Sequence, residues 1–349
     1  LFRSKGEIVE NKQLNLSEPE NIMGTMDVNP LLIKLSIPMM ISMLVQALYN
    51  VVDSVFVSHV SESALTAVSL AFSLQNVMIA VGVGTGVGVN ALLSKSLGEK
   101  NQSRANATAK NGIFLSLCSF VVFLVIGLTC MKPYFYAQTS DAAIAQQGIQ
   151  YLSVCCIFSL GLFTQTMGEK LLAATGRTYL SMISQLVGAV VNIILDPILI
   201  FALGLGVQGA AIATVLSQAV GAIWILRFLT GKKTILRLRK DYMRPEKKVI
   251  LPVMALGIST FVMMSTESLL SISFSSSLAR YGGDVAVGAM TVITSASQLC
   301  TLPIQGICQG GQPVMSFNFG AGKKPRVKEA FRFQLTLCFG YTTLFWLLM

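Results

Sequence analysis

The chain has 349 residues, of which 53% are hydrophobic and only 12% charged, and its formal net charge is +10. Soluble globular domains average about 25% charged residues, so the composition excludes an ordinary soluble domain and favours an all-α integral membrane protein. Lys and Arg lie between long apolar runs instead of in one basic domain. This pattern argues against a nucleic-acid partner and predicts that the chain contacts the lipid bilayer.

Nine apolar segments are each long enough to cross a bilayer as a helix of about 20 residues. In chain order we predict spans near 31–58, 64–93, 108–131, 143–168, 178–203, 207–229, 248–279, 285–315 and 330–349. The first 28 residues are polar and are expected to form a cytoplasmic tail. Because the ninth span runs to the last residue, we expect the chain to be part of a longer protein.

The basic residues divide unequally between the two sets of alternating loops. Of the 26 Lys and Arg residues, all except Lys132 and Arg280 fall in the tail or in every second loop after it. Lys170 is assigned to one of those loops, after the fourth span. Loops rich in Lys and Arg stay in the cytoplasm, so the N-terminus is predicted to be cytoplasmic.

The chain contains an internal repeat with an offset of 222 residues. Gly84, Gly88, Gly98 and Arg104 correspond to Gly306, Gly310, Gly320 and Arg326. Six spans separate the copies, so the repeats run parallel, as in two-lobe transporters. We predict a polar tail at 1–28, an N-terminal six-helix lobe at 29–230, a basic cytoplasmic linker at 231–247, and a partial C-terminal lobe of about three helices at 248–349.

Three carboxyl side chains lie deep within predicted spans: Asp53, Asp196 and Glu267. A charged carboxylate at mid-membrane costs about 2.5–3.5 kcal/mol. No Lys or Arg is predicted at comparable depth. Each acid is therefore expected to be protonated, to bind a cation or to face water, although a neutral acid bonded to a neighbouring helix is the simpler alternative.

Polar and methionine side chains share helix faces with these acids. Gln46 and Asn50 precede Asp53, Asn192 precedes Asp196 by one turn, and Met263, Met264 and Ser271 flank Glu267. Methionine suits an adaptable apolar pocket, but it also occurs facing lipid. The glycine run at 82–88 lacks the spacing of a nucleotide loop and is predicted to pack helices, so ATP hydrolysis by this chain is not expected.

Several motifs occur together from residue 28 onward. They are Lys34-Leu-Ser-Ile-Pro38, Tyr49-Asn-Val-Val-Asp53-Ser, Gly98-Glu-Lys-x-x-x-Arg104, Leu172-Ala-Ala-Thr-Gly176, Asn192-Ile-Ile-Leu-Asp196-Pro197 and Gly204-Leu-Gly-Val-x-Gly209-Ala-Ala. In combination they resemble the multidrug and toxic compound extrusion (MATE) transporters, in particular the bacterial MepA-like branch.

The resemblance implies twelve helices in two pseudo-symmetric six-helix lobes, of which about nine are present. It implies a monomeric, multi-pass protein of the bacterial inner (plasma) membrane that is a secondary active transporter and not an enzyme. Such an antiporter exports small organic cations by alternating access, in exchange for H⁺ or Na⁺ and without another cofactor.

The resemblance also implies site roles. Asp53, Asp196, Asn192 and Glu267 are expected to couple the ion, with Na⁺ held at Asp53 or Glu267. The residues expected to line the substrate pocket, from their positions on helix faces shared with the acids, are Gln46, Tyr49, Asn50, Met263, Met264 and Ser271. Three alternatives stay open: a lipid-linked oligosaccharide flippase of the same superfamily, a membrane enzyme, and a non-transporting membrane protein. The flippase reading requires Lys or Arg within the spans.

Overall fold

The computed structural model describes residues 22–348, with gaps at 140, 232–233, 235–244 and 282. The polar tail up to residue 21, most of the predicted linker and the side chain of Ser271 lie outside the described residues. Every regular element in the described part is helical, as predicted. The helices are α1 (Ile22–Thr25), α2 (Val28–Ser58), α3 (Glu62–Gly98), α4 (Gln102–Thr129), α5 (Met131–Gln138), α6 (Ala142–Ile157), α7 (Leu160–Ala174), α8 (Thr178–Pro197), the π-helical η1 (Ile198–Ala202), α9 (Gly206–Leu229), α10 (Lys247–Tyr281), α11 (Gly283–Gly320) and α12 (Lys324–Leu348).

Six helices in the described part are long and apolar enough to cross a membrane: α2, α3, α4, α8 with η1, α9 and the first 24 residues of α10. The pair α6 and α7 passes the same test as one span bent by 50°. The predicted spans at 285–315 and 330–349 coincide with α11 and α12, which do not meet these criteria over the described residues.

The fourth predicted span is broken, which the sequence did not indicate. It divides at Phe158 and Ser159 into α6 and α7, without proline or glycine at the break. Gly161, two residues later, lies so close to α9 that a Cβ atom there would be 3.0 Å from the backbone nitrogen of Ala219. The break therefore lets α7 pack tightly on α9, and α7 continues to Ala174, beyond the predicted end of the span.

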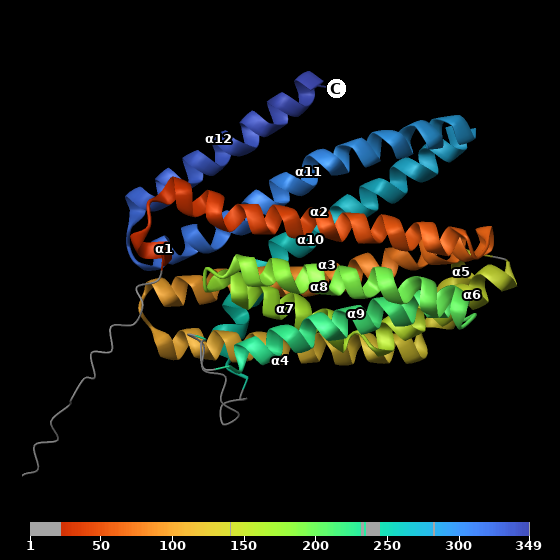
Figure 1. Ribbon diagram of the computed structural model, residues 1–349, viewed down its shortest axis with the longest axis horizontal. Helices are drawn as coiled ribbons and strands as arrows, with labels where there is room; N and C mark the ends of the chain where they lie inside the picture. Colours follow the sequence, from red (N-terminus) through yellow and green to blue (C-terminus); the bar gives the residue numbers. More distant parts are fainter. Residues whose placement is uncertain (1–21, 140, 232–233, 235–244, 282, 349) are drawn as a thin grey trace, which may run out of the picture.

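Helices α2–α9 form one group, which we call the N-terminal bundle, and α10–α12 form a second, which we call the C-terminal group. The two groups meet where α10 packs on α3 and where α11 packs on α2 and α3. We call the end that carries α1 and the turns at 99–101 and 321–323 the basic end. Figure 1 shows α11 and α12 diverging from α2 with increasing distance from this end.

The hydrophobic cores explain this divergence. One buried cluster combines residues of the N-terminal bundle, such as Leu93 and Leu171, with Val253, Val314 and Phe317 of the C-terminal group. The second cluster draws its buried residues only from α2–α9 and η1. The two groups thus share a hydrophobic core at the basic end, and the second core belongs to the N-terminal bundle alone.

The repeated glycines form the closest contacts between the groups. A Cβ at Gly88 would overlap the carbonyl oxygen of Val253 in α10, and one at Gly310 would lie 2.5 Å from the Cα atom of Ser36 in α2. These glycines occupy equivalent positions in the repeat, so α3 packs on α10 much as α11 packs on α2. Helix packing, as predicted, is the role of these glycines.

The short helix α1 is bonded to the C-terminal group although it directly precedes α2. Asn318 Nδ2 donates a hydrogen bond to the Met23 carbonyl at 3.0 Å, and Lys323 Nζ donates to the Gly24 carbonyl at 2.9 Å. The Arg326 guanidinium donates to the Met26 carbonyl and, at 3.0 Å, to Asn318 Oδ1. Helix α1 therefore ties the start of α2 to α11 and α12.

Candidate functional site

Two buried carboxyl groups of the N-terminal bundle lie on helices that pack against each other. Asp53 on α2 is 7% exposed and Asp196 on α8 is fully buried. The two carboxyl groups are close enough to interact electrostatically, although they lie far apart in sequence. The packing of α2 on α8 therefore brings together two of the three acids that the sequence singled out.

Asn192 completes this group. It lies one helical turn before Asp196, is 1% exposed, and donates a hydrogen bond from Nδ2 to Asp196 Oδ1 at 3.3 Å. Three buried oxygens, Asp53 Oδ1, Asn192 Oδ1 and Asp196 Oδ2, accept no hydrogen bond from any described residue. Buried oxygens without a donor are costly, so the arrangement favours a proton or a small cation at this position.

The helix changes its geometry immediately after Asp196. Pro197 has no N–H group to donate, and the chain continues as the π-helical η1, in which the Leu203 amide donates to the Ile198 carbonyl at 3.0 Å. A Cβ at Gly209 would lie 2.7 Å from the Leu199 carbonyl, so α9 packs directly on this wider turn. Proline signalled a distortion here, and the structure shows that it is a π-helical turn.

The predicted pocket residues on α2 lie near the acids. Gln46 and Tyr49 are half-buried, and Asn50 is exposed. Tyr49 lies one helical turn before Asp53 on α2.

The structure does not bring the predicted residues of α10 to this site. Glu267 and Met263 are exposed, Met264 is half-buried, and the Ser271 side chain lies outside the described residues. Helix α10 packs mainly on α3 and not on α2 or α8. The third acid is therefore separate from the pair formed by Asp53 and Asp196.

Two charged residues on α7 were not singled out by the sequence analysis, which placed Lys170 in a loop. Lys170 lies within α7, is 6% exposed and bonds to Gln309 of α11. Its neighbour Glu169 is half-buried and accepts hydrogen bonds from Gln165, Ser184 and Gln185. The only sequence signal was the pair of charges directly after an apolar run.

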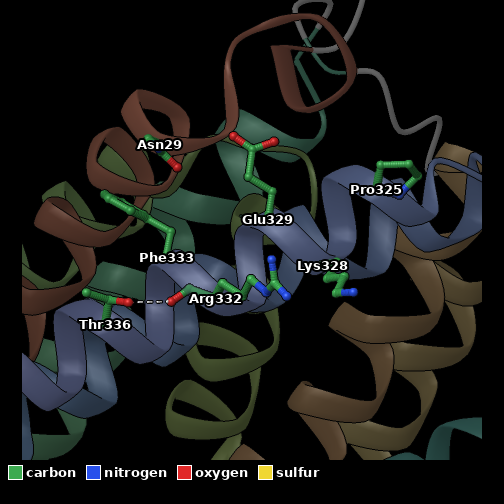
Figure 2. Close-up of a pocket in the computed structure, with 7 residues that line it drawn as sticks. All are labelled: Asn29, Pro325, Lys328, Glu329, Arg332, Phe333 and Thr336. Atoms are coloured by element: carbon green, nitrogen blue, oxygen red, sulfur yellow. Dashed lines mark hydrogen bonds between the residues drawn. The ribbon is translucent and has the colours of Figure 1, made fainter.

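A surface cavity of about 390 Å³ lies at the basic end, between the start of α2 and α12 (Figure 2). It is lined by Asn29, Pro325, Lys328, Glu329, Arg332, Phe333 and Thr336. None of the predicted coupling or substrate residues belongs to this cavity. It is therefore distinct from the Asp53, Asn192 and Asp196 group.

Comparison with known protein families identifies the family of this chain. The MatE family model matches residues 38–198 and 259–349, which include all three acids and both copies of the repeated glycines. The chain belongs to the MatE family. It is accordingly a multi-pass membrane protein of a multidrug transporter family, which is not a family of enzymes.

The chain is also similar to curated proteins that are named multidrug export proteins. The chain is 25% identical over 289 residues to the multidrug export protein MepA of Staphylococcus saprophyticus, covering 82% of this chain and 64% of MepA. It is 26% identical over 298 residues to MepA of Staphylococcus haemolyticus, covering 85% and 66%. The chain thus spans slightly less than two thirds of the length of these relatives.

Solved structures share the fold. An outward-facing multidrug resistance MATE transporter of the MOP superfamily aligns with a TM-score of 0.88 at 26% identity, covering 92% of this chain and 71% of that one. A MOP superfamily transporter from Pyrococcus furiosus, described as having a binding pocket of reverse polarity that suggests a different function, aligns at 0.84 with 25% identity, covering 92% and 71%.

Proposed function

We propose that the protein exports organic cations by alternating access, in exchange for H⁺ or Na⁺ at Asp53, Asp196 and Asn192. The observation that carries this proposal is the group of three buried, unpaired oxygens on α2 and α8. A proton or Na⁺ would satisfy them in an apolar environment, and a cationic substrate would compete for the same negative charge.

The energy of a cation gradient is sufficient for such exchange. One charge that crosses about 100 mV supplies about 2.3 kcal/mol. A singly charged substrate that leaves against the same potential costs the same amount, so the potential contributes only when one more charge enters than leaves. At about 1.4 kcal/mol per factor of ten, one such net charge corresponds to roughly a fortyfold concentration gradient of exported substrate.

The substrate would lie between the N-terminal bundle and the C-terminal group. Gln46, Tyr49 and Asn50 would contact it from α2, and Met263, Met264 and Ser271 would contact it from α10. Glu267, exposed on α10, is available as a second cation ligand. We further propose that the basic end is cytoplasmic, in a bacterial plasma membrane, because Lys and Arg concentrate there. The protein would then act as a monomer without a nucleic-acid partner.

The alternative function, a flippase, requires Lys or Arg within the spans, and Lys170 is a buried lysine. It is the single Lys or Arg among the buried residues of the described part, and it bonds to a neutral amide. A pyrophosphate group is better bound by several cations, so one lysine does not favour that function.

Ethidium efflux from a pump-deficient bacterium that expresses the full-length protein tests the proposal. Asp53→Asn and Asp196→Asn should each abolish gradient-driven efflux, whereas Asp27→Asn, an exposed acid at the start of α2, should leave it unchanged. A protonophore, and replacement of Na⁺ by K⁺, identify the ion. Full efflux by Asp53→Asn would remove Asp53 from the coupling site, and absence of efflux for every cation tested would favour the flippase.

A further inference from the structure

Glu169 and Lys170 are adjacent charged residues of α7 that the proposed ion site does not use. The Glu169 carboxylate accepts hydrogen bonds from Gln165 Nε2 at 3.0 Å, from Ser184 Oγ at 3.0 Å and from Gln185 Nε2 at 3.2 Å. All three donors belong to α7 or α8, and both carboxylate oxygens are bonded. Unlike Asp53 and Asp196, Glu169 therefore offers no unpaired oxygen to an ion, and its carboxyl group links α7 to α8.

Lys170 reaches out of this bundle. Its stem passes over Gly86, where a Cβ would lie 2.7 Å from Lys170 Cγ, and Asn90 Nδ2 donates to the Lys170 carbonyl at 3.0 Å. Its ammonium donates a hydrogen bond to Gln309 Oε1 on α11, and Gln309 Nε2 lies 3.8 Å from Met43 Sδ on α2. Helix α3 thus positions the lysine stem, and the ammonium bonds the two helix groups to each other.

The hydrogen bond between Lys170 and Gln309 depends on the distance between the two helix groups. A buried ammonium requires a hydrogen-bond acceptor and a compensating charge. Gln309 on α11 provides the acceptor. If the groups separate at the basic end, Lys170 loses this acceptor. The bond to Gln309 therefore exists only when the groups are together.

We propose that Lys170 is a positioning residue for transport, whose bond to Gln309 holds the two helix groups together within their shared core and sets the fraction of molecules in that arrangement. The proposal rests on the exchange function above, because alternating access requires the groups to separate at the basic end. Each transport cycle then breaks and re-forms the bond between Lys170 and Gln309.

Distances between spin labels at the basic end measure this fraction directly. Ser103 on α4 and Lys328 on α12 are exposed and belong to different groups. Labels attached there through a non-canonical amino acid leave the seven cysteines of this sequence in place. The variants are Lys170→Gln, Gln309→Lys and the double exchange, with Lys132→Gln, an exposed lysine of α5, as the matched control.

A hydrogen bond to a charged group shifts an equilibrium by about tenfold or more. Lys170→Gln and Gln309→Lys should each raise the ratio of molecules with the long distance to molecules with the short distance by that factor. Lys170→Gln lacks the ammonium, and Gln309→Lys places two ammonium groups together. The double exchange restores an ammonium and an amide and should return the short distance. Lys132→Gln should match the unsubstituted protein.

Efflux rates provide an independent readout. Lys170→Gln should change the maximal rate of ethidium efflux more than the ethidium concentration at half-maximal rate, because it alters the conformational step and not substrate contacts. Identical distance distributions in Lys170→Gln and the unsubstituted protein, or a folded double exchange that stays at long distance, would overturn the proposal. If the unsubstituted protein exports no cation but Lys170→Gln still lengthens the distance, the exchange function fails while the role of Lys170 in holding the groups together stands.

Discussion

Gly88 in α3 lies directly against the backbone carbonyl of Val253 in α10, so that any side chain at position 88 would overlap a main-chain atom of the other helix group. The equivalent glycine of the repeat, Gly310, lies against the backbone of Ser36 in α2. A backbone atom cannot rotate away as a side chain can. The approach of the two groups at the basic end therefore depends on the absence of a side chain at both positions.

Substitution of these glycines should separate the groups. Gly88→Val or Gly310→Val should destabilise the arrangement by about 1–3 kcal/mol through overpacking, and more where the helices cannot shift. The thermal unfolding midpoint in detergent measures the effect. Gly340→Val is the control, because a Cβ there meets nothing within 4 Å. Equal midpoints for Gly88→Val and Gly340→Val would contradict the close contact.

Arg326 and Arg104 occupy the same position in the repeat but have different partners, which makes them a matched pair. Arg326 bonds to Met26 and Asn318 and so holds the segment after α1, whereas Arg104 Nη1 donates to Glu99 within the N-terminal bundle at 3.4 Å. Arg326→Met should raise hydrogen–deuterium exchange of residues 22–27 by about tenfold, since it removes charge-assisted hydrogen bonds. Arg104→Met should leave that exchange unchanged. The same protection in both variants would show that Arg326 does not secure α1.

Glu169 has a structural role that can be separated from ion coupling. Glu169→Leu leaves Gln165, Ser184 and Gln185 without their shared acceptor, so we expect a loss of about 1–3 kcal/mol of stability. Glu99→Gln breaks only the partly exposed pairs with Lys95 and Arg104 and should cost less than about 1 kcal/mol. Thermal unfolding of both variants in the same detergent provides the comparison. A smaller loss for Glu169→Leu than for Glu99→Gln would contradict the hydrogen-bonded arrangement.

Asn192 is expected to change the affinity of the site for the coupling ion, although it carries no charge. Asn192→Ala removes both the hydrogen bond to Asp196 Oδ1 and one of the unpaired oxygens. The concentration of coupling ion at half-maximal efflux should therefore rise about tenfold, while the maximal rate changes little. Asn76→Ala, an exposed amide of α3, is the control. An unchanged ion dependence in Asn192→Ala would exclude Asn192 from the site.

Much of the site follows from local sequence. Asp53, Asn192 and Asp196 could be selected because polar groups are costly inside long apolar helices, and the +4 spacing of Asn192 and Asp196 places them on one helix face. That α2 and α8 pack together, so that Asp53 joins this pair, is a long-range contact that spacing within a helix does not encode. Glu267 was selected by the same argument, but it lies on α10, which packs mainly on α3.

The amino-acid sequence by itself determined the all-helical class, most helix positions, the parallel repeat and the packing role of its glycines. These follow from apolar run length and from residue size, which act locally. Only the tertiary structure decided that α6 and α7 break at Phe158 and that Lys170 is buried instead of solvated. It also decided that the helix groups share a core at the basic end alone. A break without proline or glycine, and a lysine at the end of an apolar run, become interpretable only when the packing of α7 on α9 and the bond from α7 to α11 are known.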